Sequence, residues 1–173
     1  MTARTPAAAL SAAVVLFFLT AQPIRAAAGP PQAGDALPAF ELEDLDGRTV
    51  SPADFSGKVV SVHFFAVWCE PCLAELPEIE KAAARYGSRG YQPLLVAVGH
   101  RQDPRRLRDF VRKRGLDVPV LYDARGSVQD LYKVTALPTN LIVGRDGRLR
   151  WSSTSMPPDF LQAIGRLVEE KSP

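Results

Sequence analysis

Residues 59–72 read VVSVHFFAVWCEPC, and this stretch decides the fold. Its first part, Val59 to Val67, is an apolar run rich in β-branched and aromatic side chains, which is typical of a strand buried on both faces. Cys69 and Cys72 follow directly, where such a strand gives way to a helix. Function in sheets of this kind gathers at the carboxyl ends of the strands, so we expect the cysteines to lie in the functional site.

Predicted strands and helices lie on both sides of this strand in the sequence. Upstream, Phe40–Leu42 and Thr49–Val50 flank an Asp46-Gly47 turn and predict a short hairpin. Downstream we expect helices over residues 75–86, 104–114 and 160–168 and strands over residues 93–98, 118–122, 140–143 and 149–153. This order predicts an α/β fold with a mixed central sheet flanked by helices on both faces.

The chemistry of Cys69 and Cys72 follows from their place at a helix start. Unpaired amide N–H groups there stabilise a thiolate, so Cys69 should be the more acidic and more nucleophilic thiol. Cys72 falls within the first turn and should be covered, and Pro71 suits that turn because it lacks an N–H that the helix could not use. The spacing lets both sulfurs meet within one turn, so dithiol and disulfide forms can interchange.

Two other roles for the cysteine pair stay open. As a structural disulfide it would close a loop of four residues, which chain-entropy arithmetic credits with only about 2 kcal/mol. As a zinc half-site it would need further ligands, for which the sequence offers His63 and His100 without a recognisable spacing. Redox exchange is favoured over both.

Two motifs carry a resemblance to a known family. The run WCEPC at residues 68–72 after an apolar strand, with ALPT at residues 136–139, resembles the thioredoxin superfamily. The secretory start, the hairpin and the Gly57-Lys58-Val59 entry to the strand resemble the TlpA/ResA/DsbE branch of thiol-disulfide oxidoreductases. The resemblance spans residues 36–168 and implies a thioredoxin-like fold with an N-terminal β-hairpin extension.

The resemblance also implies roles for single residues. Pro138 resembles the cis-proline that faces the cysteines and leaves nearby backbone free to pair with an incoming peptide. Glu75 matches an acid beneath the disulfide; the alternative is a solvated acid in the first helical turn. His63 departs from the pattern, because it stands where thioredoxin has a buried acid. It could tune the thiols or simply be a packed core histidine. Trp68 is expected to cover the disulfide as an apolar shield.

Length and composition fit a single domain after a leader. The chain has 173 residues, of which 46% are hydrophobic and two are cysteines. Residues 1–28 predict a secretory signal peptide, with an uncleaved membrane anchor as the alternative. Residues 29–38 are rich in Pro and Gly and predict a spacer that forms no packed element. Residues 39–173 are expected to form the redox domain. The protein should therefore reside in the periplasm, soluble or anchored by its N-terminal segment.

Charge excludes a general affinity for nucleic acid. Arg4 and Arg25 are the only charged residues in the first 28, which leaves 19 of the 21 Lys and Arg against 19 Asp and Glu. A neutral domain has no electrostatic drive toward a phosphate backbone. We expect a monomer with no bound cofactor or metal.

The direction of electron flow depends on how strongly the thiolate form is stabilised. The helix N-terminus favours that form, whereas Glu70 and Glu75 oppose it by a comparable amount. The sequence therefore predicts a reductant of client disulfides; a disulfide-donating oxidase and a Cu(I)-binding assembly protein are the alternatives. The resemblance implies a membrane thiol reductase as electron donor. It implies clients with cysteine pairs, either apocytochrome c or copper-site assembly proteins.

Overall fold

A computed structural model describes residues 29–170, and the predicted signal sequence lies outside them. Five strands form one mixed sheet in the order β5-β4-β3-β6-β7, and a separate antiparallel pair, β1-β2, forms the hairpin. The central strand β3 (Val59–Phe65) runs parallel to β4 (Tyr91–Val98) and antiparallel to β6 (Thr139–Val143). The predicted mixed sheet and N-terminal hairpin are therefore confirmed.

The other elements lie close to the predicted bounds. The remaining strands are β1 (Leu42–Glu43), β2 (Thr49–Val50), β5 (Val120–Asp123) and β7 (Leu149–Ser153). The helices are α1 (Glu70–Tyr86), α2 (Pro104–Arg114), α3 (Ser127–Leu131) and α4 (Phe160–Glu169), with 3-10 turns η1 (Pro52–Phe55) and η2 (Gly87–Arg89). β3 is buried along its whole length, which explains why its sequence is continuously apolar instead of alternating.

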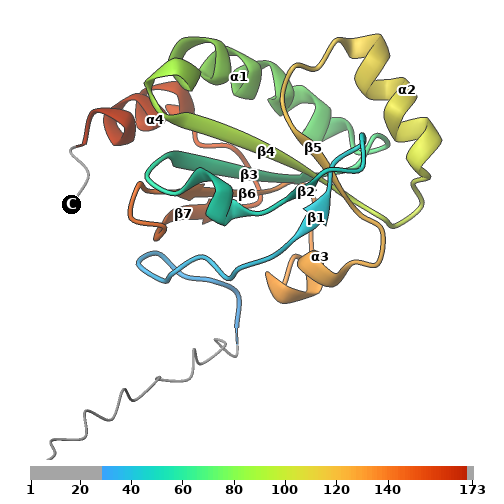
Figure 1. The fold of residues 1–173 in the computed structure, drawn as a ribbon, viewed down its shortest axis with the longest axis horizontal. Helices are drawn as coiled ribbons and strands as arrows, with labels where there is room; N and C mark the ends of the chain where they lie inside the picture. The colour runs from blue at the N-terminus through green and yellow to red at the C-terminus, as the bar shows by residue number, and fades with distance from the viewer. Residues whose placement is uncertain (1–28, 171–173) are drawn as a thin grey trace, which may run out of the picture.

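Two layers of structure cover the two faces of the sheet (Figure 1). Helices α1, α2 and α4 lie on one face, and α3 with the N-terminal segment lies on the other. Neighbouring residues of β3 show the division, because successive side chains of a strand point to opposite faces. Phe65 packs on Phe110 of α2 with ring centroids 6.5 Å apart, whereas Phe64 packs on Tyr132, just after α3, at 5.8 Å.

The N-terminal segment pairs with both edges of the sheet. Gly34 N–H donates to the Leu149 carbonyl, Leu149 N–H donates to the Asp35 carbonyl, both at 2.8 Å, and Asp44 forms a bridge with Leu121 of β5. The spacer predicted over residues 29–38 is therefore wrong for its second half, which pairs with β7. An edge strand offers unpaired backbone groups, and a segment rich in Gly and Pro can satisfy them without contributing large side chains.

Two helices differ from the predicted ranges. α1 begins at Glu70 with Cys69 as its N-cap, which confirms the helix start expected at the cysteine pair; the apolar periodicity that predicted a helix over residues 75–86 begins five residues later. α3 is missing from the prediction because five residues are too few to show a helical pattern. Asp123 holds α3 in place, since its carboxylate accepts hydrogen bonds from the Val128 and Gln129 N–H groups at 3.0 and 2.8 Å.

Tyr132 anchors the N-terminal segment to the sheet, and its hydroxyl and its ring should each contribute to the free energy of unfolding. Its hydroxyl donates to the Pro38 carbonyl at 2.5 Å, and its ring meets Phe40 edge-on at 5.8 Å. Tyr132→Phe should lower the free energy of unfolding by about 1 kcal/mol, and Tyr132→Ala by about 3 to 5 kcal/mol. Urea denaturation measures both, with the exposed neighbour Leu131→Ala as control. Equal losses in the two Tyr132 variants would contradict a separate contribution from the ring.

Candidate active site

Cys69 and Cys72 form a disulfide at the first turn of α1, with their Cα atoms 5.3 Å apart. Cys69 is the N-cap residue of the helix, and its Sγ accepts a hydrogen bond from the Cys72 N–H at 3.3 Å. Cys69 is 6% exposed and Cys72 is fully buried. The predicted order of access to the sulfurs is therefore confirmed, although Cys69 presents only a small part of its surface. The helix N-terminus that faces Cys69 would stabilise a thiolate there.

A hollow of about 560 Å³ lies beside Cys69. It is lined by residues 68–71, Val98, His100, Gln129 and residues 134–137. Trp68 is 46% exposed, and its Nε1 donates to the His100 carbonyl at 3.2 Å. Trp68 is thereby held as a wall of the hollow, and a covering role over the disulfide stays a prediction. Glu70, also exposed, lines the same hollow, so two of the three predicted tuning residues, Trp68 and Glu70, border it, whereas the third, His63, does not.

The segment before β6 forms the opposite wall. The Leu137–Pro138 peptide bond is cis, as predicted. Ala136 and Leu137 line the hollow together with Cys69, and Thr139 Oγ1 donates to the Ala136 carbonyl at 2.8 Å. Because β6 pairs directly with β3, the two motifs that are distant in sequence meet at one end of the sheet.

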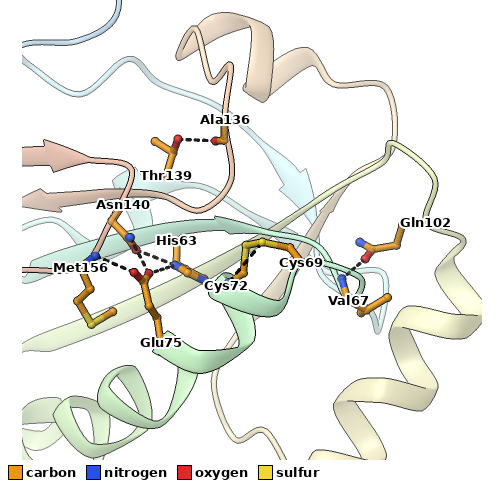
Figure 2. Close-up of a disulfide and its surroundings, with 10 residues drawn as sticks. All are labelled: His63, Val67, Cys69, Cys72, Glu75, Gln102, Ala136, Thr139, Asn140 and Met156. Atoms are coloured by element: carbon orange, nitrogen blue, oxygen red, sulfur yellow. Dashed lines mark hydrogen bonds and ion pairs between the residues drawn. A yellow bond between two sulfur atoms is a disulfide. The ribbon is translucent and has the colours of Figure 1, made fainter.

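Glu75 belongs to a hydrogen-bonded cluster, shown in Figure 2, one helical turn beyond Cys72. Its side chain is 16% exposed. Oε1 accepts the Met156 N–H at 2.7 Å, and Oε2 accepts Nδ2 of Asn140 at 2.8 Å. A solvated acid in the first turn is therefore the wrong interpretation of Glu75, because both of its oxygens are held by other parts of the chain.

His63 completes this cluster from β3. Its side chain is 1% exposed, and its Nδ1 lies 2.6 Å from Oδ1 of Asn140 and 3.6 Å from Oε2 of Glu75. Burial lowers the pKa of His63 below its ordinary value of 6.5, although Asn140, the Glu75 carboxylate and the Cys72 backbone act in the opposite direction. The imidazole is therefore neutral near pH 7, and it touches the acid instead of merely packing among apolar side chains.

Two functional positions are absent from the sequence prediction. Asn140 joins His63 to Glu75, and a polar residue in an apolar strand just after Pro138 was the available signal. Gln102 is 6% exposed and links the ends of β3 and β4, because it accepts the Val67 N–H at 2.7 Å and donates to the Val98 carbonyl at 3.1 Å. No sequence pattern distinguishes Gln102 from an ordinary loop residue.

Comparison with known proteins agrees with this geometry. The model of the AhpC/TSA family matches residues 33–152. The chain belongs to the AhpC/TSA family. The pneumococcal exposed lipoprotein thioredoxin of Streptococcus pneumoniae is 32% identical, with a TM-score of 0.63 over 75% of this chain and all of that one. A protein of Chlorobium tepidum assigned as thiol:disulfide interchange protein DsbE is 26% identical, with a TM-score of 0.70 over 80% and 96% of the two chains. The predicted thioredoxin-like fold is confirmed.

A curated relative within this comparison is the thiol-disulfide oxidoreductase ResA of Oceanobacillus iheyensis. It is 36% identical over 67% of this chain, and the match spans 62% of its own length. Among residues 29–170, no helix has the length and apolar character to cross a membrane, and no three His, Cys, Asp or Glu side chains are grouped to hold a metal ion. The site described here thus consists of the Cys69–Cys72 disulfide and the hydrogen-bonded cluster of His63, Glu75 and Asn140.

The lowered pKa of His63 predicts how stability changes with pH. The folded state resists protonation of His63, so below pH 6.5 the unfolded chain binds more protons and the free energy of unfolding rises with pH. This contribution is fully present above the ordinary pKa and is lost as the pH falls through the folded-state value. Urea unfolding of the oxidised protein between about pH 5 and 7.5 should show this slope, and His63→Asn should reduce it. A slope retained in full by His63→Asn, and lost in the exposed control His100→Asn, would contradict the assignment.

Proposed function

We propose that the chain is a thiol-disulfide oxidoreductase in which Cys69 attacks a client disulfide and Cys72 resolves the mixed disulfide. The observation that carries this proposal is the Cys69–Cys72 disulfide at the N-terminus of α1, beside a hollow whose far wall is the cis-proline segment. Thiolate attack on a disulfide needs an accessible, stabilised thiolate and a second thiol within reach. The name of the ResA relative supports the same reaction.

The proposed direction is reduction of the client. The helix N-terminus stabilises a Cys69 thiolate by about 0.3 to 1 kcal/mol. Glu70 stands between the cysteines at the surface, and the Glu75 carboxylate lies one turn further on, so negative charge on both sides opposes that thiolate. A thiolate without strong net stabilisation belongs to a dithiol that gives up its electrons readily. The alternative, a disulfide-donating oxidase, requires the opposite balance.

The proposed setting is the periplasm, where the protein acts as a monomer, soluble or anchored by its N-terminal segment. A reductant in an oxidising compartment needs a dedicated electron source, for which a membrane thiol reductase is suited. The proposed clients present a pair of oxidised cysteines, as in apocytochrome c before haem attachment or in copper-site assembly proteins. A hollow lined by Cys69 and by residues 134–137 suits an extended client segment.

A trapping experiment tests the exchange reaction. Cys72→Ser should stall the reaction at the mixed disulfide on Cys69, because the resolving thiol is gone. Expressed in the periplasm, this variant should accumulate a covalent adduct that dithiothreitol releases and that mass spectrometry assigns to Cys69. Cys69→Ser is the matched control and should form no such adduct, since Cys72 is fully buried. Equal adducts in the two variants would contradict the assigned roles.

The reduction potential tests the direction of electron flow. Because the charges around Cys69 nearly balance, the potential should lie nearer to the value of about −270 mV of thioredoxin than to about −120 mV, that of a strong oxidant. Equilibration with glutathione or dithiothreitol buffers measures it, and Glu70→Gln should shift it toward more oxidising values. A wild-type potential near the oxidant end would instead support the disulfide-donating alternative.

A further inference from the structure

Positive charge is concentrated in one segment of the domain. Residues 101–114, which comprise the end of the loop between β4 and α2 and α2 itself, hold seven Arg or Lys and two Asp. The rest of residues 29–170 holds 11 Arg or Lys and 17 Asp or Glu. All seven cations of the segment are exposed. A domain that is nearly neutral as a whole therefore presents one strongly positive surface and is negative elsewhere.

Three of these cations lie at the end of the segment that adjoins the active site. Arg101 directly follows His100, which lines the hollow beside Cys69. Arg105 and Arg106 lie in the first turn of α2. These three arginines are called the basic rim below. The hollow in which a client would lie is thus bordered on this side by positive charge.

The basic rim has no ion-pair partner among residues 29–170. The other end of α2 differs, because Arg112 pairs with Asp109 at 2.6 Å and Arg114 pairs with Glu80 at 3.6 Å. The one acid next to the rim, Asp103, accepts the Arg106 backbone N–H at 2.9 Å as the N-cap of α2. The guanidinium groups of the rim therefore remain available to carboxylates from outside the domain.

Local stability does not account for arginines at these positions. The N-terminus of a helix carries the positive end of its dipole, which favours acids, yet the first turn of α2 contains Arg105 and Arg106 and no acid. Arg101 has a φ of 53°, in the left-handed region that is unfavourable for a residue with a side chain. Residues that conflict with local preferences in this way are typical of functional surfaces.

Two hydrogen bonds fix the loop of the basic rim to the loop that carries Cys69. Oε1 of Gln102 accepts the Val67 N–H at 2.7 Å, and the His100 carbonyl accepts Nε1 of Trp68 at 3.2 Å. Figure 2 shows Gln102 beside Val67, at the same end of α1 as Cys69. A client docked on the rim would therefore be held at a defined position relative to the attacking sulfur.

We propose that the basic rim docks acidic side chains that flank the cysteine pair of the client, a role that rests on the proposed exchange function and narrows the class of client. Arginine suits this role, because its planar guanidinium binds a carboxylate through two parallel hydrogen bonds. Glu70, which also lines the hollow, repels the same carboxylates, so a client whose acids lie on the side of His100 is favoured.

The reaction itself is unchanged by docking. The dithiol of Cys69 and Cys72 becomes the disulfide, and the client disulfide takes up the two electrons and the two protons. Docking raises the rate at which the client disulfide meets Cys69, because complementary charge accelerates encounter and orients the partner.

The position of the rim favours a client over an anionic membrane surface. The N-terminal segment lies on the face of the sheet opposite to α2 (Figure 1). If the protein is anchored through that segment, it approaches the membrane from the face that does not carry the rim. The rim instead adjoins the hollow beside Cys69, where a client must lie for exchange to occur.

Two synthetic peptides test the docking. Each contains one intramolecular disulfide between two cysteines, flanked by glutamates in one peptide and by glutamines in the other. Reduced wild-type protein is mixed with each peptide, and its oxidation is followed by acid quenching and mass spectrometry. At low salt the acidic peptide should react about tenfold faster. At about 1 M salt, where the screening length falls to about 3 Å, the ratio of the two rates should approach one.

A matched pair of triple variants separates docking from the overall charge of the domain. Arg101→Gln, Arg105→Gln and Arg106→Gln together should bring the ratio of rates to within about twofold of one. The control replaces residues 112–114 by Gln, which removes the same charge at the other end of α2, and it should keep most of the preference. Because the ratio is taken within one protein, a change in the reactivity of Cys69 cancels. Equal losses in the two triple variants, or an undiminished preference without the rim, would overturn the proposal.

Failure of the docking proposal and failure of the exchange function give different results. If reduced wild-type protein is oxidised by neither peptide nor by the uncharged reagent dithiodipyridine, the exchange function is wrong. If both peptides react at the same rate, the exchange function stands and the role of the rim is wrong. Co-sedimentation with phosphatidylglycerol vesicles completes the test. Binding that is lost with the rim, together with equal peptide rates in wild type, would assign the rim to a membrane surface and overturn the proposal.

Discussion

The site depends on a strand and a helix meeting at Cys69. The amide of Cys72 points at the sulfur of Cys69 because the chain leaves β3 and enters α1 without an intervening loop long enough to turn the helix away. The same junction buries Cys72 within the first turn. One backbone arrangement therefore makes the two chemically identical thiols unequal, with one near the surface at the positive end of a helix and one enclosed.

The order of strands supplies the rest of the site. β6 lies next to β3 in the sheet, although a long stretch of chain separates the two strands. That neighbour brings the cis Leu137–Pro138 bond to the hollow and Asn140 to His63. Residues 134–137, which line the hollow, and Asn140, which belongs to the buried cluster, thus lie within a few residues of one another at the start of β6. A shift of register by one residue would turn Asn140 away from His63.

The sequence predicts well the features that depend on adjacent residues, and poorly the contacts between residues that are far apart in the chain. The buried strand and the cysteine pair were predictable, because each has a signature in a few adjacent residues. The cis-proline was predicted only through the resemblance of residues 136–139 to the thioredoxin superfamily. Apolar periodicity alone placed the start of α1 at Glu75, because a cysteine that caps a helix through its sulfur lies outside the usual capping residues, whereas the cysteine motif placed the start correctly at Cys69. Asn140 and Gln102 were missed since their partners are set by strand pairing and loop contacts. The pairing of residues 34–37 with β7 was missed for the same reason.

Charge limits which side chain can occupy the position of His63 in β3. The carboxylate of Glu75 already places one negative charge in a partly buried cluster. Loss of the Cys72 proton to solvent would add a second negative charge beside it, and like charges in a medium that solvates them poorly raise the pKa of the group that must ionise. A neutral histidine next to the Glu75 carboxylate adds no charge to the cluster. Burial holds the pKa of His63 below its ordinary value, so the ring stays neutral and adds no second charge to the cluster.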